Sequence, residues 1–216
     1  MKTTLFNASP KRGKSASGFL LEKLKARLKT DSRLEWNEGA FYAKASFDSA
    51  AGCLRESERW VFAFPLYVDG LPGHFLDFLV RLSNTALDLP QHPRVYAIVN
   101  SGFYEGKQNE LALEILSNCC ARNGWIWSGG IGVGGGPSLA VLAGAKNGRG
   151  PMAPVDAAID MLAQKIIRGE AAGTVFTQIA MPRFLYKLAG EIGWRQSIRA
   201  NGGRPRDLGK RPGAGS

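Results

Sequence analysis

Cysteine, acidic residues and long apolar runs are scarce in this chain, and each shortage excludes a class of function. The three cysteines, Cys53, Cys119 and Cys120, lack the Cys-x-x-Cys spacing of zinc or iron–sulfur sites. Cys119 and Cys120 fall in a helical stretch, so we expect them to pack in a reducing cytoplasm. No apolar run approaches the ~20 residues of a membrane helix, and no signal-peptide core follows Met1. These features predict a cytoplasmic protein without a membrane partner.

The shortage of acidic residues leaves an excess of positive charge. The chain has 28 Lys/Arg and 18 Asp/Glu, a formal net charge of +10, and residues 182–216 alone carry +6. Such an excess can indicate nucleic-acid binding, but no aromatic residues interleave the cations of residues 201–216. We therefore predict a solvated, disordered tail over 201–216 and no specific nucleic-acid partner.

Apolar stretches with strand character alternate with amphipathic helical stretches along residues 1–200, which we expect to form a single domain. Alternation of this kind predicts an α/β fold with a parallel sheet and helices on both faces. We predict five strands, in the order 2-1-3-4-5, and a further helix at the C-terminal end. The expected strands cover residues 3–7, 34–37, 60–64, 95–99 and 125–133, and the expected helices cover 15–29, 46–58, 72–82, 108–122, 155–166 and 183–198.

The stretch 3–17 runs from a strand through a loop rich in hydroxyls and cations directly into a helix. A helix that begins there points its free N–H groups, and the positive end of its dipole, at the loop. Those groups and the surrounding Ser and Lys side chains form a pocket suited to a phosphate. An ordinary strand–turn–helix, with Ser15 or Ser17 as the N-cap, stays open at this point.

Ligands of open parallel sheets bind outside the carboxyl ends of the strands, where the strand order reverses. In the expected order, that crevice is lined by the loops after the first, third and fourth strands. The loop at 65–70 is apolar with one aromatic residue, and the loop at 100–106 has an amide, a hydroxyl, aromatics and glycines. A phosphate-binding loop beside two such loops suits a ligand with a phosphate at one end and a flat heteroaromatic at the other. FMN has this shape.

Segments 7–11, 64–72 and 100–106 together resemble the flavodoxin-fold NAD(P)H-dependent FMN oxidoreductases, which include NADPH-dependent FMN reductases and flavin-containing quinone reductases. Residues 182–194 are also similar to members of this group. The resemblance implies a flavodoxin-like three-layer sandwich that binds FMN, takes hydride from NAD(P)H and passes electrons to a quinone, flavin or similar acceptor. It also implies a homodimer. Because the flavin carries the redox chemistry, we expect no catalytic acid or base and no metal ligand.

The same resemblance implies which residues hold the cofactor. The FMN phosphate would contact Ser9, Lys11, Ser15, Ala16 and Ser17. The isoalloxazine ring would lie against Pro65, Leu66, Tyr67, Val68, Asn100, Ser101, Gly102, Phe103 and Tyr104, with Tyr67 or Tyr104 over or beside it. NAD(P)H would bind transiently over the flavin, since the first loop lacks a Gly-x-Gly-x-x-Gly motif. The cysteine-rich insert of some relatives is absent, so no iron–sulfur cluster is expected.

Two other functions stay open on the sequence. A flavodoxin-type electron carrier shares the fold and cofactor but has no NAD(P)H activity of its own; such carriers are typically acidic, whereas this chain is basic. Residues 8–15 nearly match a P-loop, with Gly-Lys-Ser at 13–15 but Ala8 in place of the first glycine. A P-loop protein also needs an acidic residue after a strand to hold magnesium, and the strand at 60–64 ends in Phe64-Pro65.

Overall fold

The computed structural model describes residues 2–11, 13–41, 47–85, 92–142 and 148–206. Contacts within the chain divide it into two compact units, Met1–Ala180 and Met181–Ser216. The end of the predicted tail, residues 207–216, lies outside the described residues.

The first unit is built on a parallel sheet with the strand order β2-β1-β3-β4-β5-β6. Its strands are β1 (Lys2–Asn7), β2 (Glu35–Ala40), β3 (Arg59–Pro65), β4 (Arg94–Asn100), β5 (Ile126–Gly134) and β6 (Gly173–Gln178). The predicted order of the first five strands is confirmed. The prediction of five strands was wrong, because β6 pairs with β5 at the edge of the sheet. Only Thr177 of β6 is buried, so this strand lacks the apolar pattern of the central ones.

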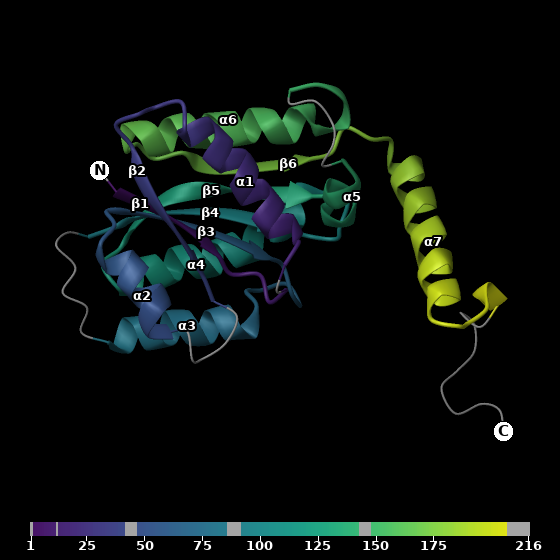
Figure 1. Cartoon of the computed structure of the whole chain (residues 1–216), viewed down its shortest axis with the longest axis horizontal. Helices are drawn as coiled ribbons and strands as arrows, with labels where there is room; N and C mark the ends of the chain where they lie inside the picture. The colour runs from purple at the N-terminus through teal and green to yellow at the C-terminus, as the bar shows by residue number, and fades with distance from the viewer. Residues whose placement is uncertain (1, 12, 42–46, 86–91, 143–147, 207–216) are drawn as a thin grey trace. The chain divides into compact units, whose positions relative to one another are not determined.

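Helices cover both faces of the sheet, as the alternation of elements predicted. Figure 1 shows α1 and α6 on one face and α2, α3 and α4 on the other. No helix was predicted between residues 134 and 151, but a short one, α5, follows β5 there, with Gly135 in the left-handed region at φ +80°. The helices of this unit are α1 (Ala16–Leu28), α2 (Phe47–Arg55), α3 (Gly73–Asn84), α4 (Glu110–Arg122), α5 (Gly136–Val141) and α6 (Ala153–Arg168), with 3₁₀ turns η2 (Gly106–Asn109) and η4 (Gly150–Met152).

Strand β3 lies at the centre of the core. It pairs with β1 on one side and β4 on the other, and all of its residues before Pro65 are buried. Alternate residues meet α3, where the ring centroids of Phe62 and Phe64 lie 5.2 and 5.1 Å from that of Phe75. A continuous apolar run is typical of a parallel strand covered on both faces, and this prediction is confirmed.

The adjacent cysteines of α4 are thiols placed for packing. Cys120 is fully buried, and burial raises its pKa to about 12. Cys119 is partly buried, and burial raises its pKa as well. A raised pKa leaves little of the reactive thiolate at neutral pH. The predicted packing role therefore fits both cysteines.

The second unit contains the helix α7 (Arg183–Ala200), which lies where the sequence predicted a final helix. The structure describes all of α7, and none of its residues is buried. Five of its large apolar side chains are exposed, namely Phe184, Leu185, Leu188, Ile192 and Trp194. Within the described residues, no helix combines the length and apolar character needed to cross a membrane.

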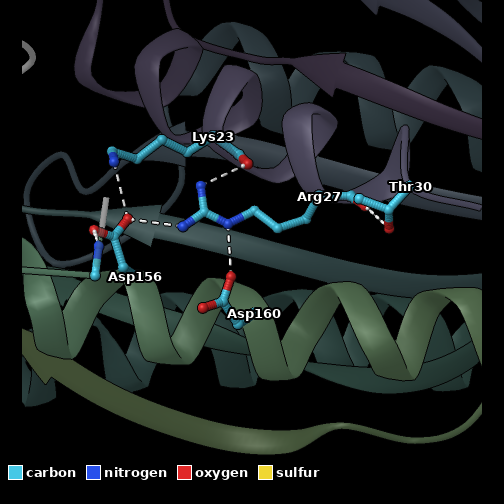
Figure 2. Close-up of polar contacts among 6 residues, drawn as sticks. Lys23, Arg27, Thr30, Asp156 and Asp160 are labelled. Atoms are coloured by element: carbon cyan, nitrogen blue, oxygen red, sulfur yellow. Dashed lines mark hydrogen bonds and ion pairs between the residues drawn. The ribbon is translucent and has the colours of Figure 1, made fainter. Parts of the chain in front are cut away.

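A buried ion cluster joins α1 to α6, the two helices on one face of the sheet. Asp156 of α6 is fully buried; its Oδ1 accepts hydrogen bonds from Lys23 Nζ at 2.9 Å and Arg27 Nη2 at 3.0 Å. Its Oδ2 accepts a bond from the Gly148 amide at 2.8 Å. Figure 2 shows Arg27 reaching between Asp156 and Asp160, whose Oδ1 is 2.6 Å from Arg27 Nε. The cluster ties α1, whose first turn borders the site described below, to its neighbour α6.

Acid is expected to weaken this cluster. Burial alone raises the pKa of Asp156, but bonds from Lys23 and Gly148 and the charge of Arg27 lower it below the ordinary value of 3.8. Since the folded-state pKa lies below the unfolded-state value, Asp156 stabilises the fold above about pH 4, and this contribution disappears as the pH falls through the folded-state pKa.

Urea unfolding at about pH 7 and about pH 3 measures how much the free energy of unfolding depends on the ionised Asp156. The wild type should lose more unfolding free energy on acidification than Asp156→Asn, which has no titrating group at this position. Equal losses of unfolding free energy in the wild type and in Asp156→Asn would contradict the stabilising role given to the Asp156 carboxylate.

Candidate functional site

A cavity of about 940 Å³ opens where β1, β3 and β4 end at their carboxyl edge. Such volumes are in the range of small-molecule and cofactor sites. The cavity is lined by residues of the three loops that the sequence singled out, with a contribution from α1 and from the start of α5. These residues are Asn7, Ser9, Lys11, Gly13, Lys14, Ser15, Ala16, Ser17, Gly18, Phe19, Glu22, Pro65, Leu66, Tyr67, Asn100, Ser101, Gly102 and Gly136.

The first loop is shaped by its own short polar side chains. Asn7 Oδ1 accepts a hydrogen bond from the Ser9 amide at 3.0 Å, and Ser9 Oγ accepts one from the Lys11 amide at 3.3 Å. Such side-chain bonds to a backbone N–H two residues on fix a turn without a regular element. Ser9 is buried in this turn, whereas Lys11 is exposed. The loop therefore carries an exposed cation on a backbone that is held by side-chain hydrogen bonds.

Helix α1 begins at the cavity. Ser15 is its N-cap, and Ser15 Oγ accepts a bond from the Gly18 amide at 3.0 Å, so the N-cap interpretation of the sequence is confirmed for Ser15. The amides of Ala16 and Ser17 belong to the first turn, where an α-helix provides no carbonyl partner. A Cβ at Gly18 would lie 3.2 Å from Asn7 Nδ2, so glycine lets the helix approach the first loop closely. With Lys11 and Lys14 in the lining, this end of the cavity suits an anion.

The second loop presents an exposed aromatic residue beside a strained turn. Tyr67 and Gly70 exchange backbone hydrogen bonds of 3.1 and 3.0 Å, and the two residues between them have φ of +48° (Val68) and +56° (Asp69). Left-handed φ is unfavourable for a β-branched residue such as Val68, and strain of this kind is concentrated at functional sites. Tyr67 is 45% exposed and lines the cavity. The turn therefore leaves an uncovered aromatic face for a ligand.

The third loop supplies buried polar groups to the cavity wall. Asn100 and Ser101 are 5% and 3% exposed. The Asn100 carbonyl accepts a bond from the Leu66 amide at 2.8 Å, which joins the second loop to the third. The Ser101 amide donates to the Val133 carbonyl at 3.0 Å, and the Ser101 carbonyl accepts from the Gly136 amide at 2.7 Å. Backbone hydrogen bonds therefore hold this wall to the second loop on one side and to β5 and the start of α5 on the other.

The structure brings most of the predicted site residues to one cavity. Val68, Phe103 and Tyr104 do not line it, although they belong to the same loops; Val68 is fully exposed and Phe103 is 51% exposed. The lining also includes residues that were not predicted as ligands, namely Asn7, Gly13, Lys14, Gly18, Phe19, Glu22 and Gly136. Gly136 comes just after the end of β5, and its position after a strand could have marked it as a site residue in the sequence. Phe19 and Glu22 share a face of α1 at a spacing of three, and nothing in the sequence distinguishes this face from an ordinary exposed one.

The geometry fits a ligand that has an anionic end and a flat ring. Helix N–H groups and lysines gather at one end, and an exposed tyrosine and buried hydrogen-bonding groups lie along the other walls. A magnesium-dependent P-loop site fits less well. Asp69 lies in the turn after β3 and does not line the cavity, and Glu22 is the acidic residue found among its described lining residues. The site therefore favours a phosphorylated heteroaromatic ligand over a magnesium–nucleotide complex.

Solved structures of other proteins have a similar fold, although no sequence match was found. No family model matches the chain, and no curated protein matches it in sequence. Similar solved structures include an FMN-dependent NADH-azoreductase from Bacillus anthracis in complex with FMN, with a TM-score of 0.57, 12% identity, and coverage of 76% of this chain and 98% of that one.

Two further structures resemble the chain. They are an NADPH-quinone reductase from P. pentosaceus (TM-score 0.54, 14% identity, 77% and 97% coverage) and a Trp repressor binding protein from Bacillus subtilis (TM-score 0.50, 17% identity, 60% and 85% coverage). At these identities the likeness establishes a common fold, and the predicted flavodoxin-like class is confirmed.

Proposed function

Because this chain has the flavodoxin-like fold of the NAD(P)H-dependent FMN reductases, we propose that it is an FMN-binding oxidoreductase. In this proposal it takes hydride from NAD(P)H, which binds transiently, and passes electrons to a small-molecule acceptor such as a quinone or a flavin. Proteins of similar structure include an FMN-dependent NADH-azoreductase and an NADPH-quinone reductase.

One observation carries the proposal: a single cavity joins the cationic start of α1 to the aromatic loop after β3 and the polar wall after β4. FMN has a phosphate, a flexible ribityl chain and a flat ring in the same succession. The helix N-terminus favours the phosphate, and the exposed Tyr67 offers a face for the ring. A ligand without a phosphate would leave Lys11 and Lys14 without a role in the cavity.

Bound FMN would supply the hydride-accepting chemistry, and the chain would supply binding and orientation. The amides of Ala16 and Ser17, with Lys11, would hold the phosphate. Ser15 Oγ accepts the Gly18 amide, so its hydroxyl proton remains available to donate to a phosphate oxygen. Pro65, Leu66 and Tyr67 would form the wall beside the ring.

We also propose that the functional form is a homodimer with the cavity near the subunit interface. The support is a set of exposed apolar side chains on two of the loops that border the cavity, namely Tyr67, Val68 and Phe103. Exposed apolar groups gathered around a binding site are typical of interaction surfaces.

Anaerobic mixing with NADH or NADPH tests the enzymatic part of the proposal. The FMN-loaded protein should lose its visible flavin absorbance with at least one of the two nucleotides and with no other protein present. A chemical reductant serves as the control, because it bleaches any bound flavin. Bleaching by the chemical reductant but by neither nucleotide would overturn the proposal in favour of an electron carrier.

A further inference from the structure

The hydroxyl of Ser17 is committed to a protein partner. Ser17 is the second residue of α1 and is 1% exposed. Its Oγ donates a hydrogen bond to Asn100 Oδ1 at 2.7 Å. A serine hydroxyl has one proton, so this side chain has none left to donate to a phosphate. The Ser17 amide is unaffected and keeps its place in the first turn of the helix.

The bond from Ser17 determines how Asn100 meets the cavity. Because Oδ1 accepts the serine proton, the side-chain NH₂ of Asn100 is the group left for other partners. Asn100 lines the cavity and is 5% exposed. Most buried polar groups in proteins are hydrogen-bonded, so a ligand acceptor atom at this wall would satisfy the amide.

A second buried amide, that of Asn109, donates to the hydroxyl of Ser101. Asn109 is fully buried, and its Nδ2 lies 3.4 Å from Ser101 Oγ, 2.8 Å from the Gly106 carbonyl and 3.3 Å from the Val133 carbonyl. The two Nδ2 protons are shared among these three acceptors, and Ser101 Oγ is the most distant of them. Because Ser101 Oγ accepts here, its own proton is available to the cavity that Ser101 lines. Asn100 and Ser101 therefore form two adjacent donors at the end of β4.

We propose that Ser17 and Asn109 are positioning residues that hold Asn100 and Ser101 as a donor pair for acceptor atoms in the non-phosphate part of the ligand. The inference deepens the proposed function and depends on it. It replaces the phosphate-binding role of the Ser17 side chain that the family resemblance implies. The Ser17 side chain reaches the end of β4, where it bonds to Asn100. The Asn100 carbonyl is bonded to Leu66, which places the donor pair beside the loop of Tyr67.

Comparison of FMN with riboflavin tests the proposal, because riboflavin lacks only the phosphate. Dissociation constants are measured by quenching of flavin fluorescence for the wild type, Ser17→Ala and Lys11→Ala. Ser17→Ala should raise both constants by the same factor, about 5- to 10-fold for one hydrogen bond. Lys11→Ala should weaken FMN and leave riboflavin nearly unchanged, and so provides the reference for a phosphate contact.

Coupling to Asn100 distinguishes positioning from a general effect on folding. Ser17→Thr keeps the hydroxyl and should restore both affinities. In an Asn100→Ala background, Ser17→Ala should cause no further loss. If Ser17→Ala does not fold, Asn100→Ala alone should still weaken FMN and riboflavin equally.

Two results would overturn the inference: a loss confined to FMN in Ser17→Ala, or unchanged affinity for both flavins in Asn100→Ala. Failure of the wild type to bind either flavin would instead overturn the proposed function itself.

Discussion

Asp156→Ala is expected to lower the free energy of unfolding by about 3–5 kcal/mol, the cost of removing one partner of a buried ion pair. The substitution deletes the carboxylate that Lys23 and Arg27 contact between α1 and α6. The charge of Lys23, whose side chain is 9% exposed in the wild type, then lacks the Asp156 carboxylate. It also removes the acceptor of the Gly148 amide. Urea unfolding followed by circular dichroism measures the loss.

Asp160 provides a matched control for this experiment. It lies four residues further along α6 and also pairs with Arg27, but its side chain is 52% exposed. Solvent screening limits such pairs, so Asp160→Ala should cost no more than about 1 kcal/mol. A Lys23→Met, Asp156→Leu double variant removes the two most buried charges of the cluster and leaves Arg27 paired with Asp160, so it should recover much of the stability. Equal losses for the two aspartates would contradict the role given to the buried cluster.

Ser9→Glu combined with Lys11→Glu is expected to raise the dissociation constant for FMN by about 100-fold or more. Each change replaces a group that favours a phosphate with a carboxylate that repels it, and a hydrogen bond to a charged group contributes about 1.5–3 kcal/mol. Riboflavin affinity should change much less, since riboflavin has no phosphate. Fluorescence titration with both flavins measures the two effects.

Lys29→Glu is the control for charge, because Lys29 is exposed at the far end of α1 and does not line the cavity. It should leave FMN affinity almost unchanged. Ser9 is buried, so Lys11→Glu alone is included as a variant that avoids a buried carboxylate; it should weaken FMN by about tenfold. Intact FMN affinity in the double variant would show that the phosphate assignment is wrong.

The central strands could be predicted because their physical signal is strong. Strands β3 and β4 are buried on both faces, and parallel strands of this kind read as continuous apolar runs. Strand β6 was missed for the opposite reason: at the edge of the sheet it needs few apolar residues, and only Thr177 is buried. The short helix α5 was missed because its start contains Gly136 and a proline, so it depends on tertiary context.

The location of the site could also be predicted, because strand order alone brings the loops after β1, β3 and β4 together. The direction of individual side chains could not. The left-handed residues Val68 and Asp69 turn the second loop outward, so Val68 leaves the cavity while Tyr67 stays in it. The bond from Ser17 to Asn100 joins residues 83 positions apart, and no local pattern predicts such a pair.

The absorption spectrum of the purified protein, after incubation with FMN and desalting, is the most direct test of FMN binding. We expect flavin bands to remain with the protein at close to one FMN per chain, and the Ser9→Glu, Lys11→Glu variant to lose them under the same treatment. A colourless wild-type protein would contradict this expectation. The cavity at the start of α1 would then belong to a different phosphorylated ligand, and nucleotides that fit the near-P-loop at residues 8–15 would be the next to test.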